Sequence, residues 1–185
     1  EEVKAFLEIP AEVDIYRILW LGKLPLTPIF SLTNSSNPGM IWTQRILFAG
    51  LLDVPDESGE TREQGTVAGI AISVLDPGSP EHKFLEMEKS IVRGRMPQKS
   101  YDCLISETFA QKLKVNPGDE VTLIGSTMFG AMSMTNFTVA GTVRFGISAL
   151  DRGALIADIT DVQTALDMDN GASEILGFFT DDIYH

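Results

Sequence analysis

Short apolar segments separated by polar turns follow one another along this chain from residue 45 onward. Residues 45–54 and 66–75 are compact apolar runs typical of strands, and the charged residues 55–60 between them have the chemistry of a turn. The pattern therefore predicts a β-hairpin. Upstream, Val3, Phe6 and Leu7 fall at helical spacing until Pro10 ends the pattern, and residues 14–44 show no clear period.

The middle of the chain predicts two helices. Residues 81–91 place Phe84, Met87 and Ile91 on one side of a helix. Leu104 and Ile105 close a strand, after which Ser106 is a candidate N-cap and Glu107 lies in the first turn, where the helix dipole favours an acid. The buried face of this second helix is predicted to be Phe109, Ala110 and Leu113.

Two half-buried antiparallel strands are predicted next. Val121 and Leu123 alternate with polar neighbours, and apolar residues recur at every second position of residues 137–145. Their connection, residues 125–136, is longer than the roughly two to five residues of most hairpin loops. It carries the apolar side chains of Met128, Phe129, Met132 and Met134.

The C-terminal part predicts a strand at residues 154–157, a helix and a final strand at 175–179. The helix is expected to begin at Thr160, which forms a capping box with Gln163. Because helices and strands alternate irregularly, the fold class is predicted as α+β, with a mixed, mainly antiparallel sheet and short helices, rather than doubly wound. We expect residues 1–185 to form one domain.

Charge restricts the possible partners. The chain has 14 basic and 26 acidic residues, a formal net charge of -12, which repels phosphate backbones and anionic lipid head groups. Nucleic acid is therefore not an expected partner. The acids of the C-terminal third are expected on solvated faces and turns: Asp158, Asp161, Asp167, Asp169, Asp181 and Asp182. The single cysteine, Cys103, lies in an apolar run and is expected to act as a small hydrophobe.

Known catalytic and cofactor motifs are incomplete in this sequence. Gly22-Lys23 lacks the first glycine of a phosphate loop, and residues 167–171 resemble the start of a calcium loop whose closing acidic position holds Phe178. His82 is the one histidine besides the C-terminal residue, so zinc sites and catalytic triads lack parts. We expect no enzyme, cofactor or metal, with an acidic active site among the aspartates as the alternative.

A series of short motifs resembles one known family. Arg93-Gly94-Arg95 is followed by Cys103-Leu104-Ile105-Ser106-Glu107, then by Asn116-Pro117-Gly118-Asp119, and finally by Phe137-Thr138-Val139-Ala140-Gly141. This order is similar to the MacB-type periplasmic core domain of ABC-transporter permeases, a family that includes the lipoprotein-releasing and FtsX-like permeases. The resemblance covers about residues 44–182 and marks Gly94, Arg95, Gly118, Asp119 and Gly141 as structural residues.

The resemblance implies an extracytoplasmic domain excised from between the first two transmembrane helices of a permease in the cytoplasmic membrane. Such a domain couples ATP hydrolysis inside the cell to release or export of a lipoprotein or other substrate. The implied partners are an ATP-binding cassette subunit or domain, a second permease copy or paralogue, and a periplasmic carrier or adaptor protein. An alternative within the family is a MacB-type exporter that docks an adaptor.

By the same resemblance, the hairpin after the Gly118-Asp119 turn is where a carrier docks. Met128, Phe129, Met132 and Met134 are therefore the candidate partner contacts, because methionine and phenylalanine suit an adaptable apolar surface. The alternative is that these four side chains fold back over the sheet as ordinary core cover.

Overall fold

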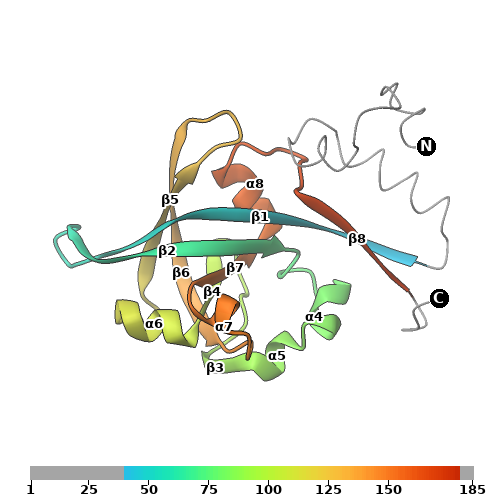
Figure 1. The fold of residues 1–185 in the computed structure, drawn as a ribbon, viewed down its shortest axis with the longest axis horizontal. Helices are drawn as coiled ribbons and strands as arrows, with labels where there is room; N and C mark the ends of the chain where they lie inside the picture. Colours follow the sequence, from blue (N-terminus) through green and yellow to red (C-terminus); the bar gives the residue numbers. More distant parts are fainter. Residues whose placement is uncertain (1–39, 180–185) are drawn as a thin grey trace.

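The structure, a computed structural model, describes residues 40–179, which form eight strands and five short helices (Figure 1). The strands are β1 (Met40–Pro55), β2 (Thr61–Ile72), β3 (Ile91–Gly94), β4 (Asp102–Ser106), β5 (Glu120–Ser126), β6 (Met132–Val143), β7 (Ala154–Asp158) and β8 (Glu174–Phe179). The helices are α4 (Pro80–Phe84), α5 (Met87–Ser90), α6 (Glu107–Leu113), α7 (Ser148–Asp151) and α8 (Ile159–Ala165). The expected helix at Val3 and most of the irregular stretch 14–44 lie outside the described residues.

Six of the strands pair in a closed ring. The order β2-β7-β4-β6-β5-β1 returns to its start because β1 also pairs with β2. β3 adds to β6, and β8 pairs with the N-terminal part of β1. The pairings β2–β7 and β4–β6 are parallel and the other six are antiparallel. The predicted α+β class with a mixed, mainly antiparallel sheet and short helices is confirmed, and the closure of the sheet is a feature that the pattern did not predict.

The ring has an apolar interior. The larger core cluster takes residues from all six strands, such as Leu52, Val139 and Leu155, and from helices α6 and α8. A smaller cluster on the outside joins Met87 of α5 to Leu104 and Ile156, which point the opposite way from their strand neighbours. Phe109, Ala110 and Leu113 of α6 are buried as predicted, and so is Cys103, whose thiol pKa is raised by burial and by the charge of Asp102.

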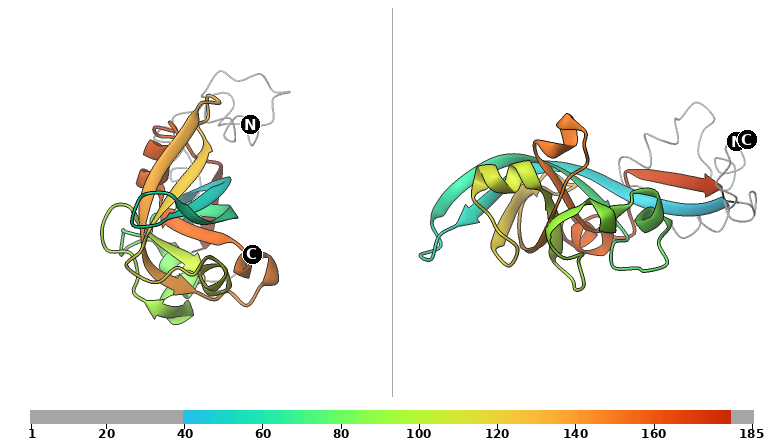
Figure 2. Two further views of the ribbon diagram at one scale, coloured as in Figure 1. Left: turned by 90° about the vertical axis from the view of Figure 1, so that its left-hand side faces the viewer. Right: turned by 90° about the horizontal axis from the view of Figure 1, so that it is seen from below.

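The predicted hairpin of β1 and β2 is confirmed. Its register pairs Ile46 with Ala71 and continues to Val54 and Glu63. β1 runs along most of the molecule, with the turn to β2 at one end and the pairing with β8 at the other (Figures 1 and 2). The strand is longer than predicted, because its first six residues pair with β8, at the far end of the sequence.

The single helix predicted for residues 81–91 is wrong. The structure has two short helices, α4 and α5, separated at Glu86, whose φ of 44° is left-handed. This conformation interrupts the helix, and Ile91 begins strand β3. Met87 is nevertheless buried, as the spacing predicted.

Both helices for which a cap was predicted exist, but their N-terminal capping differs from the prediction. Helix α8 begins at Ile159, and its cap is Asp158, which accepts a hydrogen bond from the Thr160 backbone N–H at 3.0 Å. The capping box at Thr160 is therefore wrong by two residues. Ser106 does occupy the N-cap position of α6, but its hydroxyl donates to the Asp151 carbonyl at 2.9 Å instead of capping the helix.

Candidate functional site

The hairpin of β5 and β6 is more regular than predicted. Its strands pair from Glu120 with Thr138 to Ser126 with Met132, so the expected long connection, residues 125–136, is wrong and only residues 127–131 form the turn. Thr127 holds this turn closed: its N–H donates to the Ala131 carbonyl at 2.8 Å, and its hydroxyl accepts from the Ala131 N–H at 3.1 Å. Gly130 supplies the positive φ, 85°, that the turn requires.

Three of the four predicted contact residues are exposed. Phe129 is 78% exposed at the tip, while Met132 and Met134 are 76% and 62% exposed at the start of β6. The fourth, Met128, packs against the main core, and its N–H donates to the Leu166 carbonyl at 2.9 Å. Met128 thus covers the core, as one of the two interpretations expected, whereas the other three side chains are exposed and their role as partner contacts stays a prediction.

The exposed methionines belong to a wider surface. Pairing places Met134 opposite Ile124, and Ile124 opposite Leu51, so these side chains share one face of the sheet. Alternation along β1 adds Ala49 and Leu47 to this face, and Leu47 is 47% exposed. We call this set the apolar face: Leu47, Ala49, Leu51, Ile124, Met132 and Met134. Residues 121–143 contain no Asp, Glu, Lys, Arg or His.

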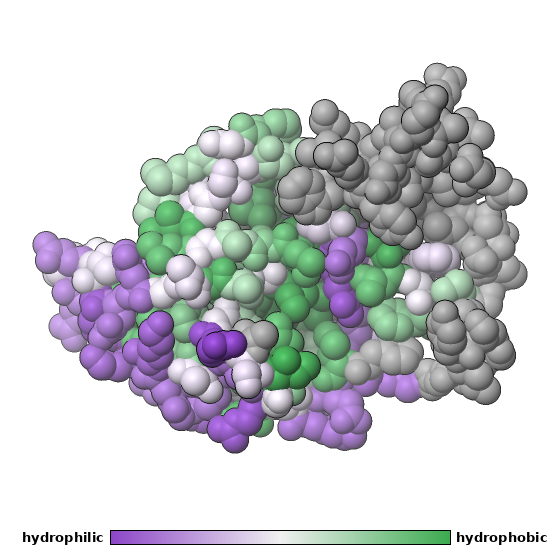
Figure 3. Space-filling model, in the orientation of Figure 1, coloured by the Kyte–Doolittle hydropathy of each residue, from purple (hydrophilic) through white to green (hydrophobic). Residues whose placement is uncertain are grey.

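The turn between β1 and β2 has the opposite character. Asp56 accepts hydrogen bonds from the hydroxyl and N–H of Ser58 and from the N–H of Glu60, and these bonds hold the pKa of its carboxyl below the ordinary value. Figure 3 shows hydrophilic colouring over this turn, at the left of the view, and a mixture of hydrophobic and near-neutral colouring over the tip of the β5–β6 hairpin at the top. An apolar hairpin tip is therefore a specific feature of β5–β6 and not of every turn.

The five residues that the resemblance marked lie together in the fold. Gly94 of β3 is opposite Gly141 of β6, and the Arg95 N–H donates to the Ala140 carbonyl at 3.0 Å. On the same edge of β6, just before β5 begins, the Gly118 N–H donates to the Val139 carbonyl at 2.8 Å and the Asp119 carbonyl accepts from the Val139 N–H at 2.9 Å. The five residues therefore lie along one edge of β6, where β3 and the start of β5 meet it.

A buried network of acids lies beside this support. Asp102 is fully buried and accepts hydrogen bonds from the Arg95 guanidinium at 2.8 Å and the Gln98 N–H at 3.1 Å. Burial alone would raise the pKa of Asp102, but the hydrogen bonds and the charge of Arg95 outweigh it, so the pKa is lowered. Arg95 thus pairs with a buried carboxylate.

Asp158 and Asp161 correct the prediction of solvated acids. Both are 4% exposed, whereas Asp167 and Asp169 are exposed as expected, and residues 181 and 182 lie outside the described part. Asp161 accepts from the Tyr101 N–H at 2.7 Å, and burial, aided by the charges of Asp158 and Asp102, raises its pKa. The sequence signal was ambiguous because each acid is followed by one apolar and one polar residue, a pattern found in turns and in the first turn of a helix alike.

The buried acids do not form an accessible reaction site. Asp102 and Asp161 have pKa values displaced in opposite directions, which an acid–base pair requires, yet their exposed fractions are 0% and 4%. In residues 40–179 no three His, Cys, Asp or Glu side chains gather so that they could hold a metal ion. The same part of the chain contains no helix long and apolar enough to cross a membrane.

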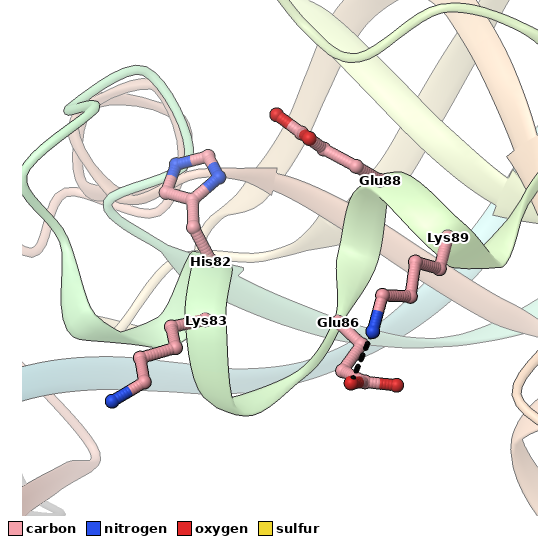
Figure 4. A pocket seen from close by; sticks show the side chains of 5 residues that line it. All are labelled: His82, Lys83, Glu86, Glu88 and Lys89. Atoms are coloured by element: carbon pink, nitrogen blue, oxygen red, sulfur yellow. Dashed lines mark hydrogen bonds and ion pairs between the residues drawn. The ribbon is translucent and has the colours of Figure 1, made fainter.

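His82 lines a small charged cavity between α4 and α5. The cavity, about 370 Å³, is also lined by Lys83, Glu86, Glu88 and Lys89. In Figure 4, His82 and Glu88 project to one side of the two helices, and Lys89 is paired with Glu86 on the other side, at 2.6 Å. That ion pair is solvent-exposed and contributes little, so the cavity is weaker as a candidate site than the hairpin.

No model of a known protein family matches this chain, and no curated protein matches its sequence.

Proposed function

We propose that this chain is an extracytoplasmic domain of an ABC-transporter permease that contacts a partner protein through the β5–β6 hairpin. The observation that carries the proposal is a hairpin without charged residues from 121 to 143, on a chain of net charge -12, that exposes Phe129 at its tip and Met132 and Met134 beside it. Exposed apolar side chains that gather in one place are typical of interaction sites.

The hairpin is suited to transmit as well as to bind. Its two strands hydrogen-bond to each other, and two further hydrogen bonds attach the hairpin to the end of α8. The Met128 N–H donates to the Leu166 carbonyl, and the Ser133 hydroxyl donates to the Ala165 carbonyl. Because the tip is attached to the body at these points, a force on the tip is passed to the sheet and not absorbed in a loose loop. The order of the Gly94, Gly118 and Gly141 motifs supports assignment to the MacB-type family.

In this proposal the domain lies on the periplasmic side of the cytoplasmic membrane and performs no chemistry. ATP hydrolysis by a cytoplasmic ATP-binding cassette partner moves the membrane helices, and the paired domains follow. The apolar tip then holds a periplasmic carrier or an adaptor protein. Substrate release or export results from the movement of the paired domains relative to each other.

Location is tested by thiol labelling of the full-length parent protein. A Ser58→Cys substitution places a thiol on the exposed turn of β1–β2, and the buried Cys103, with its raised thiol pKa, is expected to stay unlabelled. A membrane-impermeant maleimide should label the variant in intact cells once the outer envelope admits it. Labelling that requires opening the cytoplasmic membrane would disprove the extracytoplasmic location.

Partner contact is tested by photo-crosslinking in the same cells. A benzoylphenylalanine at position 129 should yield one discrete protein adduct, which a Met134→Asp substitution reduces at least fivefold. The matched control carries the photo-reactive residue at position 57, on the charged turn of the other hairpin, where no discrete adduct is expected. Equal adduct patterns from positions 129 and 57 would contradict the proposed contact.

A further inference from the structure

One edge of β1 is open among the described residues. The Arg45 carbonyl accepts from the Ser173 N–H at 2.8 Å, and the Leu47 N–H donates to the Ser173 hydroxyl at 3.1 Å, so odd-numbered residues of β1 direct their backbone groups toward β8. Backbone groups alternate along a strand. The backbone groups of Trp42 and Gln44 therefore face the opposite edge of β1. Further along the strand, β2 occupies that edge.

β2 does not reach these residues. Its pairing with β1 begins at Ile46 opposite Ala71, and the chain turns away after Ile72, where the Val74 N–H donates back to the Ile72 carbonyl at 2.7 Å. A groove of about 310 Å³ lies there, between residues 41–44 of β1 and residues 73–80. We call it the edge groove. The edge groove lies beyond the end of β2, beside the same edge of β1. An additional strand bound there would pair with β1 where β2 no longer does.

The edge groove contains buried polar groups without partners. The Trp42 indole N–H, the Gln44 amide oxygen and the Ser79 hydroxyl are buried, and none has a hydrogen-bond partner in the part of the chain that the structure describes. Buried polar atoms are usually hydrogen-bonded, so an unpaired donor, an acceptor and a hydroxyl beside an open strand edge point to a missing ligand.

We propose that the edge groove binds an extended peptide of a partner protein, which adds a strand to β1 at residues 40–44 and carries a basic side chain. Strand addition satisfies the open backbone groups of Trp42 and Gln44, and the peptide's own polar groups reach the indole and Ser79. The basic residue follows from charge: Asp76 lines the groove, Lys and Arg do not, and the chain carries -12. This site is separate from the hairpin tip and does not depend on the proposed hairpin contact.

Capped six-residue peptides of alternating threonine and valine test the proposal on the full chain. One carries a central lysine and its counterpart a central glutamate, and binding is followed by NMR on the amide signals of residues 40–44 and the Trp42 indole signal. The lysine peptide should shift these signals and bind at least fivefold more tightly than the glutamate peptide. Failure of both peptides to move the signals, as when residues 1–39 of the chain itself fill the groove, would overturn the proposal.

Backbone methylation distinguishes strand addition from side-chain binding. N-methyl groups at one alternate set of peptide positions should weaken binding at least tenfold, and those at the intervening set should change it less than twofold. Equal effects of the two sets would exclude strand addition. In the protein, Ser79→Tyr fills the groove and should abolish binding, while Ser58→Tyr, on the distant β1–β2 turn, should leave it unchanged. Retained binding to Ser79→Tyr would also overturn the proposal.

Discussion

Gly94 and Gly141 face each other across the β3–β6 pairing, and neither position has room for a side chain. A Cβ on Gly94 would lie 2.3 Å from the Ala140 carbonyl oxygen, and a Cβ on Gly141 would lie 2.6 Å from the Arg95 carbonyl oxygen. Gly94 also has a φ of 78°, in the left-handed region that favours glycine. Two backbones thus approach more closely here than any other residue type would allow.

The close approach makes Gly94→Ala a severe substitution. Steric overlap with backbone and an unfavourable φ add together, so we expect a loss of about 3 kcal/mol of unfolding free energy. Gly59→Ala is the matched control: its φ is 83°, but a Cβ there meets nothing within 4 Å, so only about 1 kcal/mol should be lost. Urea denaturation measures both. Equal losses would show that φ alone, and not the contact with β6, requires glycine at position 94.

The pattern of apolar and polar residues predicted those elements whose formation depends on residues close in the sequence. The β1–β2 hairpin follows from alternation and a charged turn, and the buried face of α6 follows from helical spacing. The break at Glu86 was not predictable, because the residues around it suit a helix and the chain needs Ile91 in β3 beside Val143. The ring closure depends on β2 lying parallel to β7, a pairing between residues more than eighty positions apart that no local pattern records.

The candidate site was predictable in composition but not in geometry. The uncharged residues 125–136, with three methionines and a phenylalanine, were visible in the sequence. Which side chains are exposed depends on the register, since Met132 and Met134 lie two residues apart on one face while Met128 turns toward Leu166. The burial of Asp161 was likewise hidden, because its hydrogen-bond donor is the distant Tyr101 N–H.

Different methionines of the hairpin should serve stability and partner contact. Met128 packs against the core, so Met128→Ala is expected to cost about 1 to 2 kcal/mol of unfolding free energy. Met132→Ala removes an exposed side chain and should change stability by less than about 0.5 kcal/mol, yet it should reduce the crosslink from position 129. Thermal unfolding combined with crosslinking measures both effects. A large stability loss for Met132→Ala would mean that its side chain belongs to the fold.

Asp161 should make the domain less stable as the pH rises. Its pKa in the folded state is raised above the ordinary value of 3.8, so the folded protein holds the proton more tightly than the unfolded chain does. This contribution is most favourable below the unfolded pKa and is lost as the pH rises through the folded pKa. Asp161→Asn keeps an acceptor for the Tyr101 N–H and removes the charge.

The Asp161→Asn variant should therefore be more stable than the parent at pH 7, and the difference should vanish as the pH falls below 3.8. Chemical denaturation across this pH range is the measurement, with Asp169→Asn, an exposed acid nearby in sequence, as the control that should show no such trend. A variant that is less stable at pH 7 would mean that the ionised carboxylate is required for the hydrogen bond to Tyr101.

The last expectation concerns Glu81, which is fully buried and hydrogen-bonded to the Arg45 guanidinium. Burial raises the pKa of Glu81, and Arg45 opposes that shift. Arg45→Met leaves an unpaired acid in the interior, so a loss of about 3 kcal/mol is expected at pH 7. The loss should shrink as the pH falls through the raised pKa, because a protonated Glu81 needs no cation. Adding Glu81→Gln should restore most of the stability at pH 7. A double variant no more stable than Arg45→Met would show that Arg45 acts through the packing of its side-chain stem and not through its charge.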